Sequence, residues 1–173
     1  MPRRAPPAAP ELDFASLVKQ HQAMVFSIAW NMLRERAVAE ELAQDVFLSL
    51  HEHLAELESP SHVLFWLRRV TSNRALDEAR RRQRRPMVSL EQAPEPVTLA
   101  AVGDPLLGAA LQKLVAALPE KARAIVVLRY QEDLDPTEIA RVLGIPVGTV
   151  KSQLQRALAL LREKLSRSLG EIL

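Results

Sequence analysis

Apolar side chains recur at steps of three and four along most of this chain, which is the spacing of one face of an α-helix. The first apolar stripe comprises Phe14, Leu17, Val18, His21, Val25, Ile28 and Met32. A second stripe comprises Val38, Leu42, Val46, Leu50, Leu54 and Leu57. Because no segment alternates convincingly with the period of two that marks a strand, the pattern predicts an all-α fold.

A third helix is expected to begin near Val63, after Pro60, because proline biases the residue before it away from helical backbone angles. Its inward stripe is expected to comprise Leu67, Val70, Thr71, Ala75 and Ala79. Another face of this helix carries Trp66, Arg69, Asn73, Asp77, Arg80 and Arg84. The third helix is therefore expected to bury one side and to present a polar, arginine-rich side elsewhere.

The composition changes between residues 86 and 105, where four prolines interrupt the helical periodicity. Such a segment is typical of a flexible linker. It predicts two small helical domains, which are an N-terminal bundle over residues 13–85, after a flexible tail of residues 1–12, and a C-terminal four-helix domain over residues 106–173. In the C-terminal domain, one helix is expected to end at Pro119 and the next to run from there to about Tyr130.

The sharpest local signals lie between Asp135 and Ile145. Asp135 can cap a helix that has Pro136 at its first position, and Glu138 can reach back to the capping residue. Gly144 favours the left-handed backbone conformation that ends a helix, and a short turn with glycine joins the steeply crossed helices of DNA-binding motifs. Residues 135–165 therefore predict a helix-turn-helix, with Ile145 filling the gap between its two helices.

The second helix of this motif has an apolar face and a polar tip. Its buried residues are expected to be Val150, Leu154, Ala157, Leu158, Leu161 and Leu165. Its outward residues near the N-terminal end are Thr149, Lys151, Ser152, Gln153, Gln155 and Arg156. In such motifs this end enters the major groove, where arginine and lysine address guanine and glutamine addresses adenine. The pattern favours DNA binding, although two packed helices with a solvated polar face would have the same spacing.

The chain has 173 residues, of which 48% are apolar and 25% charged, as is typical of a soluble folded protein. No window reaches the roughly 18 apolar residues of a membrane span, and the N-terminus lacks the apolar core of a secretory signal. The absence of cysteine excludes disulfides and thiolate chemistry, and it agrees with a reducing compartment. We therefore expect a cytoplasmic protein with no membrane contact of its own.

Charge is segregated along the chain, although the net charge is only +2. Between residues 35 and 58 there are seven acidic residues against one arginine. Between residues 68 and 85 there are eight arginines against two acidic residues. One surface is therefore expected to repel a phosphate backbone and its neighbour to attract it.

The candidates for catalysis or metal binding are few. His21 lies on an apolar stripe, His62 lies at a loop, and His51 and His53 are about 200° apart around one helix, which does not suit one metal ion. No nucleophile constellation or phosphate-cradling glycine loop is present among the five glycines. The sequence therefore predicts a protein that is not an enzyme and that needs no cofactor or metal.

Three groups of motifs lie at residues 118–157, at residues 40–47 and at residues 65–85. Together they resemble the extracytoplasmic-function (ECF) group of bacterial sigma factors, whose members have regions 2 and 4 only. Four motifs of this chain resemble the fourth region of these sigma factors. They are LPEKAR at residues 118–123, EIA at 138–140, GTVKS at 148–152 and RA at 156–157. The polymerase-binding part of the second region is resembled by EELAQDVF at residues 40–47. The part that opens and reads the promoter's −10 element is resembled by FWL at residues 65–67 with Asn73, Asp77 and the arginine run.

The resemblance implies three sets of binding residues. The −35 element would be contacted by Arg129, Thr149, Lys151, Ser152, Gln153, Gln155 and Arg156. The separated strand of the −10 element would be contacted by Trp66, Arg69, Asn73, Asp77, Arg80, Arg81 and Arg84. Core RNA polymerase would be contacted by Glu41, Gln44, Asp45, Leu48 and Glu52, which share one helix face.

The implied partners are core RNA polymerase, promoter DNA and an anti-sigma factor. The polymerase would be contacted through its largest-subunit clamp and the flap of its second-largest subunit.

Two other hypotheses remain open at this point. One is a stand-alone helix-turn-helix regulator that dimerises on a palindrome. The other is an adaptor whose acidic and basic faces both bind proteins, without a role on DNA.

Overall fold

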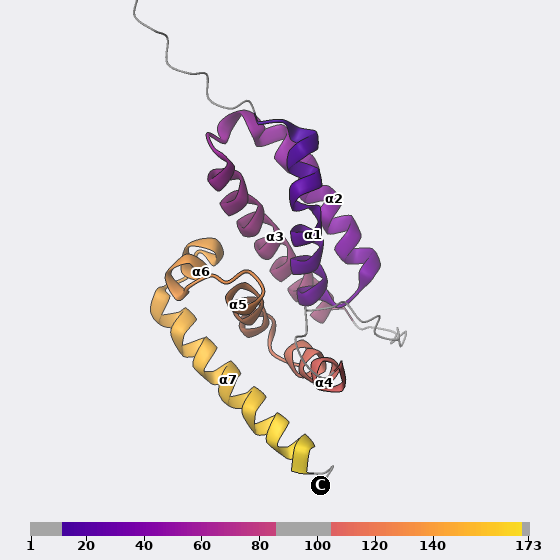
Figure 1. The fold of residues 1–173 in the computed structure, drawn as a ribbon, viewed down its shortest axis with the longest axis vertical. Helices are drawn as coiled ribbons and strands as arrows, with labels where there is room; N and C mark the ends of the chain where they lie inside the picture. The colour runs from indigo at the N-terminus through magenta and orange to yellow at the C-terminus, as the bar shows by residue number, and fades with distance from the viewer. Residues whose placement is uncertain (1–11, 86–104, 171–173) are drawn as a thin grey trace, which may run out of the picture.

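A computed structural model of the protein describes residues 12–85 and 105–170. Within these residues the chain forms seven α-helices and one short 3-10 helix, and it contains no strand (Figure 1). The predicted all-α fold is thereby confirmed. The predicted tail and linker lie outside the described residues, apart from Leu12 and Pro105.

The N-terminal helices form one group. They are α1 (Phe14–Leu33), α2 (Arg36–His53) and α3 (Pro60–Gln83), with the 3-10 helix η1 (Leu54–Glu56) between the last two. In Figure 1 these helices lie side by side along the long axis of the molecule. Their apolar stripes pack inward, as the sequence predicts.

The start of α3 corrects one boundary, since the helix begins at Pro60 and not near Val63. Ser59 has an extended backbone, and its hydroxyl oxygen accepts a hydrogen bond from the backbone N–H of His62 at 3.1 Å. Proline fits the first position of a helix because the missing N–H has no helical partner there. Pro60 therefore starts this helix, whereas the sequence pattern predicts only that it ends the preceding segment.

The C-terminal helices are α4 (Pro105–Ala116), α5 (Glu120–Tyr130), α6 (Pro136–Leu143) and α7 (Val147–Gly170). Pro119 is the capping residue before α5 and not its first helical residue. In Figure 1, α5 lies between the N-terminal helices and α7. Both α5 and α6 pack against the N-terminal helices and join the two groups.

Helix α6 has the caps that the sequence predicts. The Asp135 carboxylate accepts from the backbone N–H of Glu138 at 2.9 Å, and the Glu138 carboxylate accepts from the backbone N–H of Asp135 at 2.8 Å. Gly144 ends the helix with φ = 65°, and Ile145 packs against the core. These contacts satisfy backbone groups that a helix end leaves without partners.

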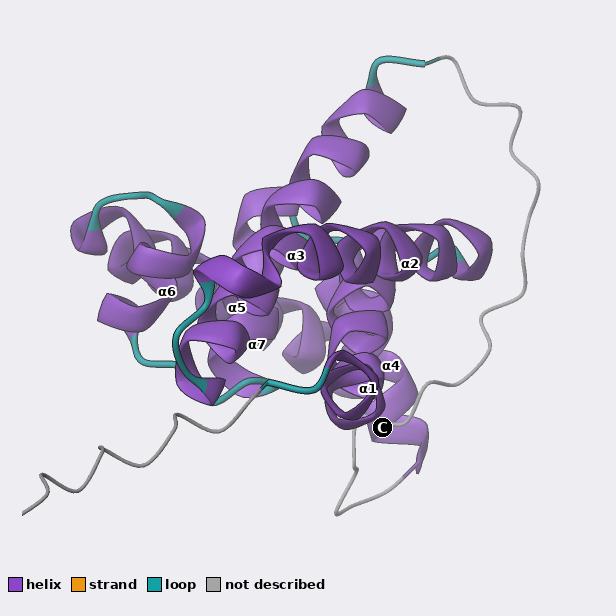
Figure 2. Ribbon diagram, turned by 90° about the horizontal axis from the view of Figure 1, so that it is seen from above, coloured by secondary structure: helices purple, strands orange, loops and turns teal. Residues whose placement is uncertain are grey.

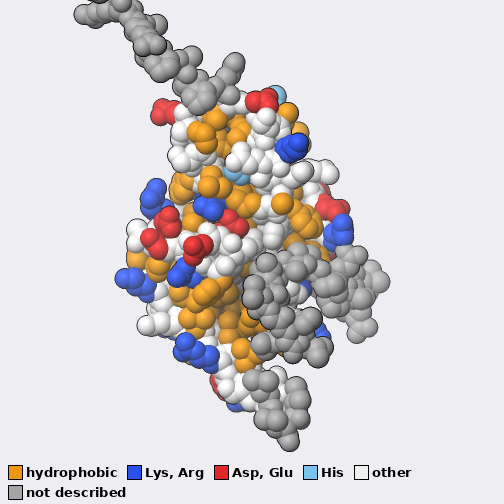
Figure 3. Space-filling model, viewed as in Figure 1, with side chains coloured by type: hydrophobic (Ala, Val, Ile, Leu, Met, Phe, Trp, Pro, Cys, Tyr) orange, Lys and Arg blue, Asp and Glu red, His pale blue; other side chains and the backbone are white. Residues whose placement is uncertain are grey.

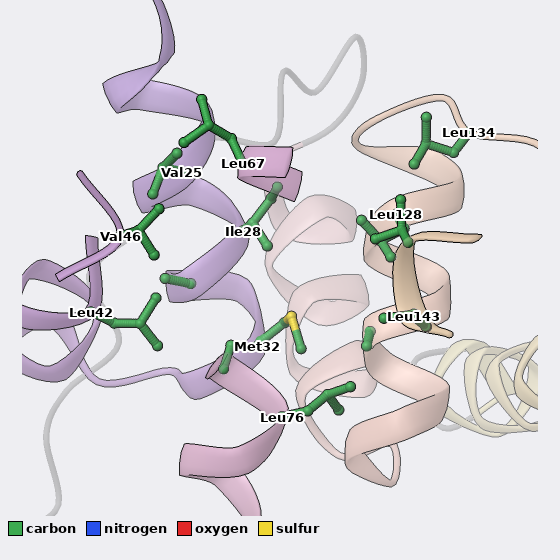
Figure 4. Close-up of a cluster of buried hydrophobic side chains, with 14 of the residues drawn as sticks. Val25, Ile28, Met32, Leu42, Val46, Leu67, Leu76, Leu128, Leu134 and Leu143 are labelled. Atoms are coloured by element: carbon green, nitrogen blue, oxygen red, sulfur yellow. The ribbon is translucent and has the colours of Figure 1, made fainter. Parts of the chain in front are cut away.

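A single hydrophobic cluster runs through both groups of helices. Figure 4 shows Ile28 and Met32 of α1 and Leu76 of α3 on one side of it, with Leu128 of α5 and Leu143 of α6 on the other. Burying a side chain of this size fully contributes roughly 1.5 to 3 kcal/mol. The packing of the two groups against each other, also visible from above in Figure 2, therefore rests on apolar burial.

A smaller cluster holds α7 against α5 and α4. Its buried members are Leu118, Ala122, Val126, Ala157 and Leu161. Val150, at the start of α7, belongs instead to the larger cluster. Leu154 packs against both clusters, whereas Leu158 and Leu165, which were also predicted to be buried, are only half-buried and belong to neither cluster.

The caps of α6 yield a stability prediction. Asp135→Ala removes a hydrogen-bond acceptor at the helix start and should lower the free energy of unfolding by about 1 kcal/mol. Gly144→Ala should cost about 1 kcal/mol as well, because the added Cβ meets no atom within 4 Å and only the left-handed backbone is strained. Urea unfolding followed by circular dichroism measures both changes.

Thr137→Ala, at an exposed position of the same helix, is the matched control and should change the stability by less than about 0.5 kcal/mol. An Asp135→Ala protein as stable as this control would contradict the contribution of the capping box.

Candidate nucleic-acid interface

The tip of α7 presents the predicted DNA-contacting side chains. Lys151, Gln155 and Arg156 are exposed, while Thr149, Ser152 and Gln153 are half-buried. The Ser152 hydroxyl donates to the backbone carbonyl of Thr149 at 3.1 Å, within the first turn of the helix. The opposite side of this turn is anchored by the buried Val150, so that the polar side chains project from a fixed helix end.

Arg129, also predicted to contact the −35 element, lies at the end of α5. Its guanidinium donates to the Asp133 carboxylate and to the carbonyl of Leu134, both at 3.4 Å, and lies over the Tyr130 ring at 5.6 Å from the centroid. Because the Asp133 side chain is 98% exposed, this ion pair is weak and easily exchanged for another anion. The arginine is thus held beside the turn that leads into α6.

The predicted polymerase-contacting residues share one exposed face of α2. They are Glu41, Gln44, Asp45, Leu48 and Glu52. Leu48 is 66% exposed, which is the highest value among the large apolar side chains of the described residues. Beside it lies a shallow groove of about 800 Å³, which α1 and α2 line with Phe14, Phe26 and Phe47. Apolar surface beside acidic groups suits a protein partner.

The acidic and basic segments that are separate in the sequence meet in space. A cleft of about 400 Å³ between α2 and α3 is lined by Glu41 and Asp45 on one side and by Arg74, Arg81 and Arg85 on the other. The charge pattern of the sequence predicts one surface that repels phosphate and one that attracts it. Here their charges partly neutralise each other, since they face one cleft. In the view of Figure 3, basic and acidic side chains are likewise interspersed with apolar ones.

The arginines at the end of α3 differ in their partners. Arg81 donates twice to the Glu78 carboxylate, at 2.9 Å, and these hydrogen bonds raise the pKa of the arginine above its usual value. Arg80 lies 3.7 Å from the Asp77 carboxylate in an exposed pair. Arg84 is exposed at the C-cap of the helix. Such exposed ion pairs contribute little to stability, so a phosphate group can replace the carboxylate as the partner of the arginine.

Trp66, Arg69 and Asn73 are engaged within the protein. The Trp66 ring lies 5.8 Å from the His53 ring, centroid to centroid. Arg69 donates to the carbonyl of Arg141 at 3.0 Å, and the Asn73 amide donates to the carbonyl of Val142 at 3.4 Å. Two of the side chains predicted to read the −10 element, Arg69 and Asn73, therefore touch α6, the first helix of the helix-turn-helix.

Further polar contacts between the two groups of helices were not anticipated from the sequence. The Asn31 amide donates to Gln131 Oε1 at 2.6 Å, and Arg68 Nε donates to Glu132 Oε2 at 3.0 Å. The Glu132 side chain is only 8% exposed. Residues so far apart in the chain carry no local signal of such pairing.

Arg123 lies within the motif at residues 118–123 and links two helix ends. Its guanidinium donates to the carbonyl of Met32 at 2.6 Å and to the carbonyl of Leu118 at 3.0 Å. Burial lowers the pKa of this arginine, and the nearby Arg34 lowers it further, against the opposite effect of Glu120. Both carbonyls lie near helix C-termini, where a cation is favoured.

Within residues 12–85 and 105–170, no cluster of three or more histidine or acidic side chains has the arrangement of a metal site. None of the helices in this part of the chain is long and apolar enough to cross a membrane.

Comparison with known proteins accounts for both groups of helices. Residues 17–85 match the family model for sigma-70 region 2, and residues 108–161 match the model for sigma-70 region 4. The ECF RNA polymerase sigma factor SigE of Mycolicibacterium smegmatis is 34% identical to this chain. The matched part covers 95% of this chain and 65% of the length of SigE. The RNA polymerase sigma-E factor of Streptomyces coelicolor is 32% identical over 89% of this chain and 86% of its own length.

A solved structure has the same fold. It is the sigma factor RpoE in complex with the anti-sigma factor NepR from Bartonella quintana, with a TM-score of 0.72, 22% sequence identity and coverage of 89% of this chain and 97% of that one. The helix-turn-helix, the preceding bundle and the order of the two matched regions agree in one assignment. The chain belongs to the ECF group of the sigma-70 family of RNA polymerase sigma factors.

Proposed function

We propose that this protein binds core RNA polymerase and directs it to specific promoters in the cytoplasm. In this role it contacts the −35 element through α7 and the separated strand of the −10 element through α3. The observation that carries the proposal is the capped helix-turn-helix with its exposed polar tip, in a chain that matches both sigma-70 regions. Sigma factors act by binding, so the proposal assigns no catalytic residue.

The tip of α7 suits duplex DNA. Lys151 and Arg156 provide positive charge for phosphates or guanine edges, and Gln155 provides an amide that can pair with adenine. Thr149 and Ser152, which are half-buried in the first turn, can hold the backbone of the same strand. We assign the −35 contacts to these side chains, together with Gln153 and Arg129.

The exposed face of α2 suits the polymerase. Its carboxylates at Glu41, Asp45 and Glu52 favour a basic partner surface, and Leu48 supplies an apolar centre that loses water on contact. We assign this face to the clamp of the largest subunit and leave the flap of the second-largest subunit to the C-terminal helices.

The polar side of α3 suits a single strand. Arginine side chains attract the backbone, and an aromatic ring can stack on a base that has left the duplex, worth roughly 1 to 3 kcal/mol per base. We assign these contacts to Trp66, Arg69, Asn73, Asp77, Arg80, Arg81 and Arg84. Since RpoE of Bartonella quintana was crystallised with an anti-sigma factor, we propose such a regulator for this protein as well.

A stand-alone regulator and a DNA-independent adaptor are less well supported. Neither function explains why residues 17–85, which form the N-terminal helices, match sigma-70 region 2. A regulator that dimerises would also need a self-complementary surface, and none is identified among residues 12–85 and 105–170.

The central prediction concerns transcription. Purified protein added to core RNA polymerase is expected to start transcripts from fragments of its own genome that core polymerase alone ignores. Sequencing of the transcripts made in vitro from a genomic library measures this. If no fragment in a library of full coverage gives a new start site, the sigma function is wrong.

A second prediction concerns the acidic face of α2. Reversing two charges with Glu41→Lys and Asp45→Lys should weaken binding to core polymerase by about tenfold or more, since removing each charge pair at the interface costs on the order of 1 kcal/mol. Competition with a labelled wild-type protein for core polymerase measures the change, and circular dichroism verifies the helix content.

The control for net charge is the double variant Glu56→Lys and Glu163→Lys, which reverses two exposed charges elsewhere. It should bind core polymerase nearly as well as the wild type. If both double variants weaken polymerase binding equally, only the net charge of the protein matters. The assignment of α2 to the polymerase interface is then wrong.

A third prediction concerns the tip of α7. Lys151→Ala with Arg156→Ala should weaken the binding of the polymerase complex to a promoter duplex and make its salt dependence shallower, by about 0.9 in the logarithmic slope for each phosphate that the protein no longer neutralises. Filter binding over a range of salt concentrations measures the slope. Lys164→Ala with Arg167→Ala removes the same charge from the far end of the same helix and should leave the slope unchanged. A slope that responds equally to both pairs would argue against specific phosphate contacts at the tip.

A further inference from the structure

An apolar cavity lies where α4, α5 and α7 meet the C-terminal end of α1, which Figure 1 shows next to α4. Its volume is about 330 Å³, which falls within the range of roughly 300 to 1,000 Å³ that small-molecule sites usually have. Its apolar wall includes Leu111 and Val115 of α4, Val126 of α5, and Leu158 and Leu161 of α7. None of these side chains belongs to the DNA-contacting surfaces or to the face of α2 described above.

Small side chains at this junction leave the space open. Ala116 lines the cavity, and Ala157 is buried in the smaller cluster, to which Val126 and Leu161 of the cavity wall also belong. A well-packed protein interior leaves few voids larger than a water molecule, so a space of this size is unusual. The Leu111 side chain in its wall remains exposed. The described residues of the protein therefore leave this apolar surface incompletely covered.

Arg34 is the only charged residue among the described residues that line the cavity. Its half-buried guanidinium lies over the Trp30 ring, 5.0 Å from the centroid, and makes no ion pair within the described part of the chain. The next residue, Glu35, pairs with Arg82 instead. Burial lowers the pKa of Arg34, and the nearby Arg123 adds a second positive charge. A cation that has lost water without gaining a carboxylate partner favours an anionic ligand.

The polar side of the cavity is held in place by the end of α1. Arg34 is the C-cap of this helix and has a left-handed backbone with φ = 57°, which a residue with a Cβ rarely adopts. Such strained positions are typical of binding sites. Asn31, one turn earlier, donates to Gln131 Oε1 at 2.6 Å, and both residues line the cavity. The guanidinium and these two amides thus lie together, opposite the apolar side chains of α4 and α7.

We propose that this cavity binds a medium-chain carboxylate, with the apolar chain between α4, α5 and α7 and the carboxylate on the Arg34 guanidinium. The volume holds about ten non-hydrogen atoms if each takes roughly 30 Å³, as in liquid water, and octanoate has this size. The sign of the charge selects an anion over a cationic amphiphile, since none of the described lining residues is acidic. The site does not depend on the proposed function, because it belongs to the free chain.

The first test is titration calorimetry of the full chain with octanoate. One molecule per chain should bind, with a dissociation constant below about 1 mM. From hexanoate to octanoate the affinity should rise about fourfold for each methylene, as more apolar surface leaves water. Octyltrimethylammonium, which has the same chain and the opposite charge, should not bind measurably.

Arg34→Gln tests the contact with the carboxylate. It should weaken the binding of octanoate at least about tenfold, because a hydrogen bond to a charged group is lost, and leave the affinity for 1-octanol unchanged. Lys113→Gln removes a charge from an exposed position of α4 that does not line the cavity, and it should change neither affinity. Equal losses in the two variants would reduce the effect to net charge and contradict the carboxylate contact.

Ala116→Leu tests the position of the apolar chain. The larger side chain fills part of the cavity and should weaken the binding of both octanoate and 1-octanol about tenfold or more, because several methylenes lose their place. Ala109→Leu adds the same volume at an exposed position of α4 and should leave both affinities unchanged. Circular dichroism and thermal unfolding verify that both variants are folded.

Nuclear Overhauser effects from octanoate to the methyl groups of Val115 and Leu158 locate the ligand without any substitution. Effects from these methyl groups to residues 86–104 would assign the cavity to the chain itself, and effects to a differently labelled second copy would assign it to self-association. Either result overturns the proposal. So does the absence of saturable octanoate binding, or an Arg34→Gln protein that binds octanoate as well as the wild type.

These outcomes involve neither polymerase nor DNA. If octanoate binds as expected but no promoter is used, the carboxylate site stands and the sigma function fails. If promoters are used by a protein that does not bind octanoate, the sigma function stands and the carboxylate site is refuted.

Discussion

Helix α5 is the element on which the rest of the packing depends, because it is buried on two sides. Ile125 and Leu128 enter the large cluster shared with α1 and α3, whereas Ala122 and Val126 enter the smaller cluster shared with α4 and α7. A helix with apolar side chains on most of its circumference has to be central in a small protein, since no single neighbour can cover it. Once α5 is enclosed, the turn after it places α6 against α3 and directs α7 away from the bundle. The helix-turn-helix is thereby presented from a fixed base.

The local elements were predictable because their signals lie within a few residues. The capping box of Asp135 with Glu138 and the left-handed Gly144 are specified by neighbours in the sequence, and the structure has both. The apolar stripe of α7 is present in part, since three of its six predicted residues are buried and the other three are half-buried. The start of α3 was missed because Ser59 and Pro60 can end one segment and also begin another, and local propensity does not distinguish these roles. The motifs also led to the correct family, since they combine several such local patterns in a fixed order.

The relation between the two groups of helices was not predictable in the same way. The pairing of Arg68 with Glu132 and of Asn31 with Gln131 joins residues far apart in the chain, and a surface pattern of polar residues on a helix does not reveal the partner. The segregation of charge along the chain likewise did not reveal how the charged segments meet in space. The acidic face of α2 and the arginines of α3 line one cleft, so the charges of each side weaken the electrostatic potential of the other. Assignment of the binding residues from motifs therefore did not separate freely exposed side chains from those, such as Trp66 and Asn73, that contact other parts of the protein.

The contacts of Arg69 and Asn73 with α6 illustrate a constraint on side chains that are to bind nucleic acid. Arginine and asparagine that can hydrogen-bond to a nucleic acid strand are also good donors to backbone carbonyls, and the C-terminal end of a helix offers such carbonyls at close range. In a small chain whose helices share one core, the end of α6 lies beside Arg69 and Asn73, so the protein can satisfy them before DNA does. An intramolecular partner has a high effective concentration, which a separate strand has to overcome. A strand that is to bind the Asn73 amide therefore has to compete with the carbonyl of Val142.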